Sequence, residues 1–172
     1  MTVTVTDAEG RPVRDAVVYA VPQGRPVAPP VARAVMDQRD RQFVPRVLPV
    51  QTGTAVDFPN SDDVRHQVYS FSPAKRFQLP LYEGTPQHPV VFERAGVVVL
   101  GCNIHDRMSA YVVVVDTPHF ASAPRGKAEL RNLPPGSYEV RAWHPGSGAE
   151  HAARGVELAA SDHLSLELPA GR

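Results

Sequence analysis

Short valine-rich runs, separated every few residues by proline or glycine, restrict the fold of this chain more than any other feature. The sequence contains 26 valines and a single isoleucine, together with 18 prolines and 12 glycines. The β-branched side chain of valine favours strands, and proline interrupts long helices. No heptad pattern and no helical stripe persists between the prolines. The pattern therefore predicts an all-β fold built of β-sandwiches.

The expected strands form three blocks, which we take as residues 1–30, 31–116 and 117–172. A proline-rich stretch, residues 22–30, separates the first block from the second. A chain of 172 residues has room for one or two small domains. The expected strands are residues 2–6, 16–21, 33–37, 43–50, 54–58, 67–71, 97–100, 111–115, 127–130, 137–143, 155–158 and 163–168.

Charge and hydropathy exclude two classes of partner. Eighteen basic and eighteen acidic residues give a net charge of zero, so the basic footprint of a nucleic-acid-binding protein is missing. No apolar run approaches the roughly 20 residues that a membrane-spanning helix needs. We therefore expect neither a nucleic-acid partner nor a membrane span.

The single cysteine, Cys102, lies in a segment rich in soft metal donors. One cysteine allows no intramolecular disulfide and no paired-cysteine zinc site. His105 and Met108 follow it in a C-x2-H-x2-M pattern, and His66 lies upstream. Two histidines, one cysteine and one methionine are the donor set of blue copper sites, in which the methionine is a long, weak axial ligand.

Four other interpretations of these residues can be weighed. Structural zinc does not recruit methionine, and covalent haem attachment needs a second cysteine. A cysteine nucleophile needs a base and an orienting third residue, which no pattern in the sequence indicates. Taken singly, Cys102 and Met108 are better explained as packing residues. Their combination with two histidines at this spacing favours copper.

Several segments of the middle block resemble the cupredoxins, most closely the plastocyanin-like and amicyanin-like bacterial proteins called methylamine utilization proteins. The resemblance covers about half the chain, and its Cys-to-Met spacing is similar to that of amicyanin. The matching segments are residues 43–45 (FVP), 53–60 (GTAVDFPN), Asp62, His66, 68–71 (VYSF), 75–82 (KRFQLPLY) and 101–108 (GCNIHDRM).

The resemblance implies a Greek-key β-sandwich with one type 1 copper ion. It makes His66, Cys102 and His105 the equatorial ligands and Met108 the axial one. It also implies single-electron transfer between redox protein partners in the periplasm, without turnover of a substrate, so we expect no enzyme activity. No signal peptide is visible at the start of the chain. In cupredoxins the histidine of the cysteine loop reaches the surface, so His105 is the expected electron port.

Two features depart from the family pattern. Relatives often carry asparagine directly after the first histidine ligand, where this chain has Gln67. We therefore expect different hydrogen bonds around the ligands. Amicyanin-like loops are apolar between histidine and methionine, whereas this loop contains Asp106 and Arg107. The charged pair calls an apolar docking patch into question.

The two ends of the chain resemble a carboxypeptidase-regulatory-like or transthyretin-like β-sandwich, through residues 3–13, 16–19 and 126–143. This resemblance predicts one sandwich made from both ends with the cupredoxin inserted between them. In a plainer alternative, the N-terminal strands extend the cupredoxin and the C-terminal block forms a separate domain. Trp143 is interpreted as a core residue rather than a sugar platform.

Two other functions remain as alternatives to electron transfer. The first is a non-catalytic module that carries copper or binds carbohydrate or a partner. The second is a metalloenzyme.

Overall fold

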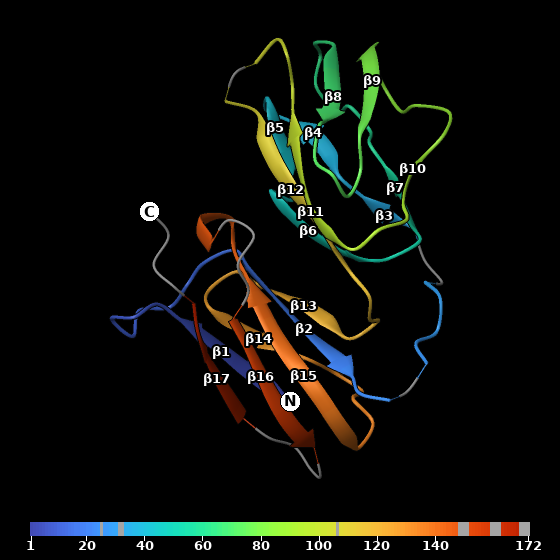
Figure 1. Ribbon diagram of the computed structural model, residues 1–172. Coiled ribbons are helices and arrows are strands. Elements are labelled where there is room, and N and C mark those ends of the chain that lie inside the picture. The colour runs from blue at the N-terminus through green and yellow to red at the C-terminus, as the bar shows by residue number, and fades with distance from the viewer. Residues whose placement is uncertain (25, 31–32, 106, 148–151, 159–162, 169–172) are drawn as a thin grey trace. The chain divides into compact units, whose positions relative to one another are not determined.

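The computed structural model describes residues 1–24, 26–30, 33–105, 107–147, 152–158 and 163–168. It divides into a terminal unit, Met1–Ala28 with Asp116–Arg172, and a central unit, Pro29–Val115. Apart from one short 3-10 helix, Pro145–Ser147, the regular structure of these residues is β-strand (Figure 1). The predicted all-β fold class is thus confirmed. No helix among the described residues is long and apolar enough to cross a membrane.

The terminal unit joins strands from both ends of the chain in two sheets. One sheet has the order β14-β1-β17 and the other the order β13-β2-β15-β16. Strand β1 pairs in parallel with β17, and β2 pairs antiparallel with β15, so blue strands from the start of the chain lie beside orange and red strands from its end (Figure 1). The strands are β1 (Thr2–Thr6), β2 (Ala16–Pro22), β13 (Phe120–Ala123), β14 (Lys127–Glu129), β15 (Gly136–Trp143), β16 (Ala152–Leu158) and β17 (His163–Glu167).

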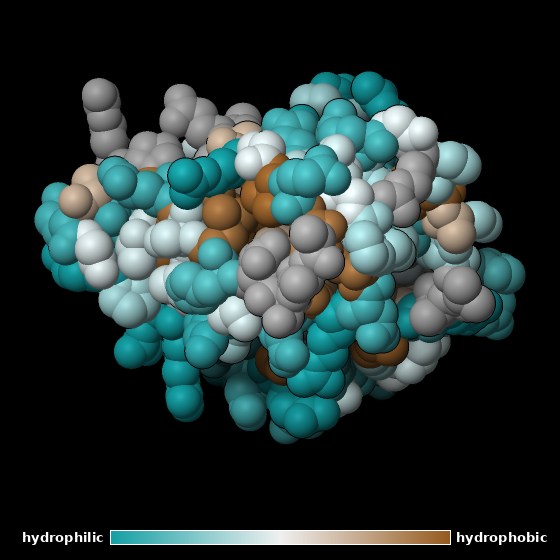
Figure 2. Space-filling view, turned by 90° about the horizontal axis from the view of Figure 1, so that it is seen from below, coloured by the Kyte–Doolittle hydropathy of each residue, from teal (hydrophilic) through white to brown (hydrophobic). Residues whose placement is uncertain are grey.

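The core of the terminal unit follows from the alternation of apolar and polar residues. In β1 the sequence TVTVT buries Val3 and Val5 completely, because successive side chains point to opposite faces of a sheet. The side chains of the main buried cluster of this unit are aliphatic except for that of Tyr138. Trp143 is only 1% exposed, so the core interpretation is correct and the sugar-platform interpretation is wrong. On the face in Figure 2, hydrophobic residues gather near the middle among hydrophilic ones.

The central unit contains a five-stranded sheet, a three-stranded sheet and a two-stranded hairpin. Their orders are β6-β12-β11-β8-β9, β10-β7-β3 and β4-β5. Strand β12 pairs antiparallel with β11 and in parallel with β6. The strands are β3 (Ala34–Val35), β4 (Asp37–Arg39), β5 (Gln42–Val44), β6 (Val47–Gln51), β7 (Thr54–Asp57), β8 (His66–Ser70), β9 (Phe77–Tyr82), β10 (Val90–Phe92), β11 (Gly96–Gly101) and β12 (Ser109–Val115).

Several expected strand boundaries were wrong. The single strands expected at residues 33–37 and 43–50 are each divided in two, as β3 with β4 and β5 with β6. The pattern also missed β9, β10 and β13. Strand β9 contains Pro80, which argues against a central strand, but β9 lies at the edge of its sheet. Proline is tolerated at an edge because its missing N–H is not needed by a neighbour.

The core of the central unit places sulfur-containing side chains among aromatic and aliphatic ones. The rings of Phe58, Phe77 and Phe92 lie 5.8–6.5 Å apart, measured between centroids. Cys102 and Met108 belong to the same buried cluster. Cys102 directly follows β11 and Met108 directly precedes β12, so this core reaches the loop with the C-x2-H-x2-M pattern.

Candidate metal centre

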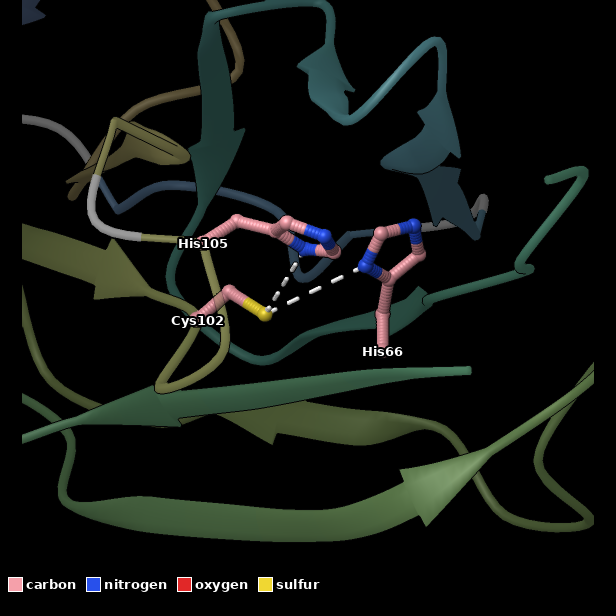
Figure 3. A group of neighbouring side chains, drawn as sticks. All are labelled: His66, Cys102 and His105. Carbon is pink, nitrogen blue, oxygen red and sulfur yellow. Dashed lines mark hydrogen bonds between the residues drawn. The ribbon is translucent and has the colours of Figure 1, made fainter. Parts of the chain in front are cut away.

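Three of the four predicted ligands meet in the central unit. The donor atoms of His66, Cys102 and His105 all lie within 4.8 Å of one another. Cys102 Sγ is 3.9 Å from Nδ1 of His66 and 3.9 Å from Nδ1 of His105, and Figure 3 shows both nitrogens turned toward the sulfur. The two imidazole rings are 4.9 Å apart between centroids. Among the described residues, no other group of three His, Cys, Asp or Glu side chains converges in this way.

Strand pairing brings these side chains together. His66 begins β8, and Cys102 follows the last residue of β11. Gly101 pairs with Tyr69 of β8 on one side and with Ser109 of β12 on the other, so both ends of the loop are held. A Cβ atom at position 101 would lie 2.7 Å from the Tyr69 ring. Only glycine therefore allows the ring to pack directly against the backbone beside Cys102.

The three converging side chains differ in exposure. His66 is completely buried and Cys102 is 4% exposed, whereas His105 is partly exposed. Buried polar groups are costly unless they are hydrogen-bonded, which applies to the buried ring of His66. His105 is the member of this group that reaches toward solvent.

Met108 lies in the same part of the core. Its side chain is 2% exposed and belongs to the buried cluster that contains Cys102. Its backbone N–H donates to the carbonyl of His105 at 2.9 Å, which closes the turn between the two residues. Both Cys102 and Met108 line a cavity of about 520 Å³. The assignment of the Met108 thioether as a ligand stays a prediction.

Asp62 holds the outer nitrogen of His66. Its Oδ2 atom lies 2.6 Å from Nε2 of His66, and its two oxygens accept the backbone N–H groups of Asp40 at 2.6 Å and Arg41 at 2.9 Å. Because Nε2 is engaged with the carboxylate, Nδ1 is left facing Cys102. Burial alone would raise the pKa of Asp62, but these hydrogen bonds outweigh burial and lower it.

The same carboxylate stabilises an unusual turn. Asp40 and Arg41, between β4 and β5, have φ angles of 53° and 57°. Residues other than glycine rarely adopt this left-handed conformation except in tight hairpin turns. The two N–H groups that point to Asp62 belong to these residues, so the turn and His66 share one acceptor. The sequence comparison included Asp62 but predicted no role for it.

Gln67 and Asn103 connect the two segments that carry the donors. The Asn103 Nδ2 group donates to Gln67 Oε1 at 2.8 Å. Gln67 directly follows His66, and Asn103 directly follows Cys102. Gln67, which stands where relatives often carry asparagine, thus forms a side-chain hydrogen bond that links the two donor segments. Asp106, the other member of the predicted charged pair with Arg107, lies outside the described residues.

Tyr82 and Asn60 tie down the loop before His66. The Asn60 amide donates to the carbonyls of Val64 at 2.8 Å and Tyr82 at 3.0 Å. The Tyr82 hydroxyl donates to the Phe58 carbonyl at 2.7 Å and accepts a hydrogen bond from Gln38. Burial, with a contribution from negative charge on Cys102, raises the pKa of Tyr82 to about 12.

The donor chemistry of this site fits copper. The cysteine sulfur and two imidazoles converge in a largely buried setting, and a thioether packs in the same core. Such soft and borderline donors suit copper in both oxidation states. A carboxylate behind one imidazole is a recurrent support of metal-binding histidines.

Comparison with known proteins gives structural neighbours only. No protein-family model matches the sequence, and no curated protein matches it. The similar solved structures include a Cu-containing nitrite reductase (NirK) from Thermus scotoductus SA-01, with 23% identity, 53% of this chain covered and a TM-score of 0.45. This chain spans 25% of that reductase.

Two further neighbours are small proteins that are covered almost entirely. A purple cupredoxin from Nitrosopumilus maritimus has 24% identity over 48% of this chain and 99% of its own, with a TM-score of 0.43. An oxidized mutant of amicyanin has 21% identity over 56% of this chain and 99% of its own, with a TM-score of 0.44. Since all three TM-scores are below 0.5, the case for a metal centre rests on the donor geometry of this chain.

Proposed function

We propose that this protein holds one type 1 copper ion and carries single electrons between redox partners. The observation that supports the proposal is the convergence of the Cys102 sulfur and the inner nitrogens of His66 and His105 within 4.8 Å. When bound, copper would supply a centre that alternates between Cu(I) and Cu(II). In the proposal, Met108 is the fourth donor.

The surrounding residues suit electron transfer because they limit movement. Asp62 holds the outer nitrogen of His66, and the Gln67–Asn103 hydrogen bond joins the two donor segments. A site whose ligands are held on rigid strands changes little between oxidation states. His105, as the partly exposed donor, is the proposed electron port.

We propose that the protein is an electron carrier rather than an enzyme. Four protein donors leave no open position on the ion for a substrate, as a catalytic metal requires. The proposed partners are redox proteins, and the proposed location is the periplasm. We further propose that the terminal unit is the transthyretin-like sandwich expected from the sequence, and that it supports the central unit.

Copper carriage is the second candidate, since the thiolate and thioether donors also suit stored Cu(I). Rapid electron self-exchange by the copper-loaded protein would support electron transfer. Slow self-exchange, together with release of Cu(I) to a metal-free acceptor protein, would support carriage instead.

Titration of the purified chain with Cu(II), followed by visible absorption and EPR spectroscopy, tests the proposal. We expect an intense thiolate-to-copper band and a small copper hyperfine splitting at one equivalent. The Cys102→Ala variant should lose this band while its far-ultraviolet circular dichroism remains that of a β protein. A weak band with an ordinary tetragonal EPR signal, or an intense band retained in the variant, would contradict the type 1 assignment.

A further inference from the structure

Three arginines border a second cavity of the central unit, on the Met108 side of the candidate metal centre. The cavity has a volume of about 470 Å³. Its basic residues come from three segments: Arg41 from the β4–β5 turn, Arg46 from the segment before β6, and Arg107 from the loop before β12. The remaining described residues of its wall are Asp40, Gln42, Phe43, Met108 and Ser109.

The positive charge at this cavity exceeds the negative charge of the described wall. Asp40 is its one carboxylate, against three guanidinium groups. Arg41 and Arg107 are exposed, and neither forms an ion pair with another residue in the part of the chain that the structure describes. Asp106, next to Arg107, carries a further negative charge in the sequence, which still leaves one net positive charge.

Neighbouring carboxylates are already engaged elsewhere. Asp62 accepts hydrogen bonds from the β4–β5 turn and from His66. Asp37 pairs with Arg39 at 2.9 Å and accepts a hydrogen bond from Ser61. These two acids therefore do not compensate Arg41 and Arg107.

The cavity shares one residue, Met108, with the proposed copper site. Met108 forms part of its wall and packs in the buried cluster that contains Cys102. A molecule seated at the rim would thus approach the centre from the side of the proposed axial ligand.

We propose that Arg41, Arg46 and Arg107 form a docking surface for an acidic patch on the redox partner, an inference that rests on the proposed electron-transfer function. All three arginines are exposed and come from separate segments, so they form a rim rather than an enclosed pocket for one small anion. A rim of this kind matches carboxylates spread over a protein surface. Guanidinium groups bind such carboxylates in bidentate geometry.

The neutral charge of the whole chain makes this surface measurable. With a net charge of zero, the protein as a whole neither attracts nor repels an ion. A difference in binding or in reaction rate between anionic and cationic probes therefore reports the charge near the binding surface. Exposed charges are screened beyond about 10 Å at 0.1 M ionic strength, so the difference is greatest at low salt.

The first test needs no copper. Hexacyanochromate(III), a paramagnetic anion, is added to the metal-free full chain. Broadening of the protein's backbone amide NMR signals is then measured. We expect broadening at Arg41, Gln42 and Ser109, and none with the cation hexaamminechromium(III). The double variant Arg41→Gln/Arg107→Gln should bind the anion roughly three- to tenfold more weakly.

Arg94→Gln is the matched control for that test. Arg94 is exposed, lies in the turn between β10 and β11, and its replacement removes one positive charge at the other end of β11. The control should keep the broadening of the parent protein. Absence of broadening at the rim, or an equal loss of anion binding in Arg94→Gln and in the double variant, would overturn the inference.

The second test measures oxidation of the Cu(I) protein, in which the probe gains the one electron that copper loses. We expect the rate with ferricyanide to fall as salt increases and to fall in the double variant. The rate with the cation tris(phenanthroline)cobalt(III) should not fall in either case. If the type 1 spectrum is absent while the anion still binds, the proposed function fails and the basic surface stands. If the spectrum is present but ferricyanide shows no dependence on salt or on the variants, the docking inference fails alone.

Discussion

The two units bury different kinds of side chain although both are built of β-sheets. The main buried cluster of the terminal unit is aliphatic apart from Tyr138, and two further aromatic residues, Tyr19 and Trp143, are buried outside that cluster. The core of the central unit also contains Cys102 and Met108, and His66 is completely buried in the same unit. One β architecture thus serves packing alone in the first case and presents metal donors in the second.

The difference has an energetic reason. Burial of an imidazole is unfavourable unless its nitrogens have partners. In the central unit, Asp62 supplies one partner for His66, and Cys102 Sγ faces the other nitrogen at 3.9 Å. The terminal core needs no such support because apolar side chains gain stability from burial itself. We expect mutations in the two cores to separate stability from metal binding.

The largest loss of stability is expected in the terminal core. Leu130 is 2% exposed there, and Leu130→Ala should lower the free energy of unfolding by about 2–5 kcal/mol through lost burial and a residual cavity. The absorption per bound copper should not change. Urea denaturation and a copper titration of the same sample measure both effects. Leu81→Ala, at a side chain that is 51% exposed, is the control. A change in the copper band of Leu130→Ala would contradict the separation of stability from metal binding.

The next largest effect is expected at Asp62, where the carboxylate accepts three hydrogen bonds. In Asp62→Asn the amide nitrogen faces an N–H donor whichever way the group is turned. We expect copper affinity to fall about 10- to 100-fold, as for other carboxylates behind metal-binding histidines. Competition with a copper chelator of known affinity measures the change. Asp63→Asn removes the same charge at an exposed neighbour and should bind like the parent; equal affinities in both variants would exclude a positioning role for Asp62.

A smaller effect on stability is expected for Met108→Leu. The two side chains have similar volumes, so the free energy of unfolding should change by less than about 1.5 kcal/mol. The reduction potential should rise, because loss of the thioether disfavours Cu(II). Cyclic voltammetry of the variant and the parent measures this shift. A fall in potential would show that Met108 is not the axial ligand.

The smallest effect is expected at alkaline pH. Since burial raises the pKa of Tyr82 to about 12, the folded protein retains this proton after the unfolded chain has lost it near pH 10. The contribution of Tyr82 to stability is therefore complete below pH 10 and decreases as the pH rises toward 12. Denaturation between pH 9 and 11 should show that the free energy of unfolding decreases more steeply with pH in the parent than in Tyr82→Phe. Identical slopes would contradict the shift.

Local patterns predicted the elements that depend on neighbouring residues in the sequence. The alternation in β1 and the valine run of β12 were sufficient to predict strands there. Prolines misled the prediction in β9, because the sequence does not state whether a strand lies at the edge of its sheet. The loop from Cys102 to Met108 was also recognisable, since its three donor residues are close in sequence.

The sequence by itself therefore determined an all-β fold and a short loop with three soft donor residues. Only the tertiary structure decided that His66, 36 residues before Cys102, turns its inner nitrogen toward the sulfur, and that Asp62 holds the outer one. It also decided that arginines from three segments border one cavity. The physical reason is that strand and loop patterns reflect local conformational preferences, whereas a metal centre depends on the pairing of strands that are distant in the sequence.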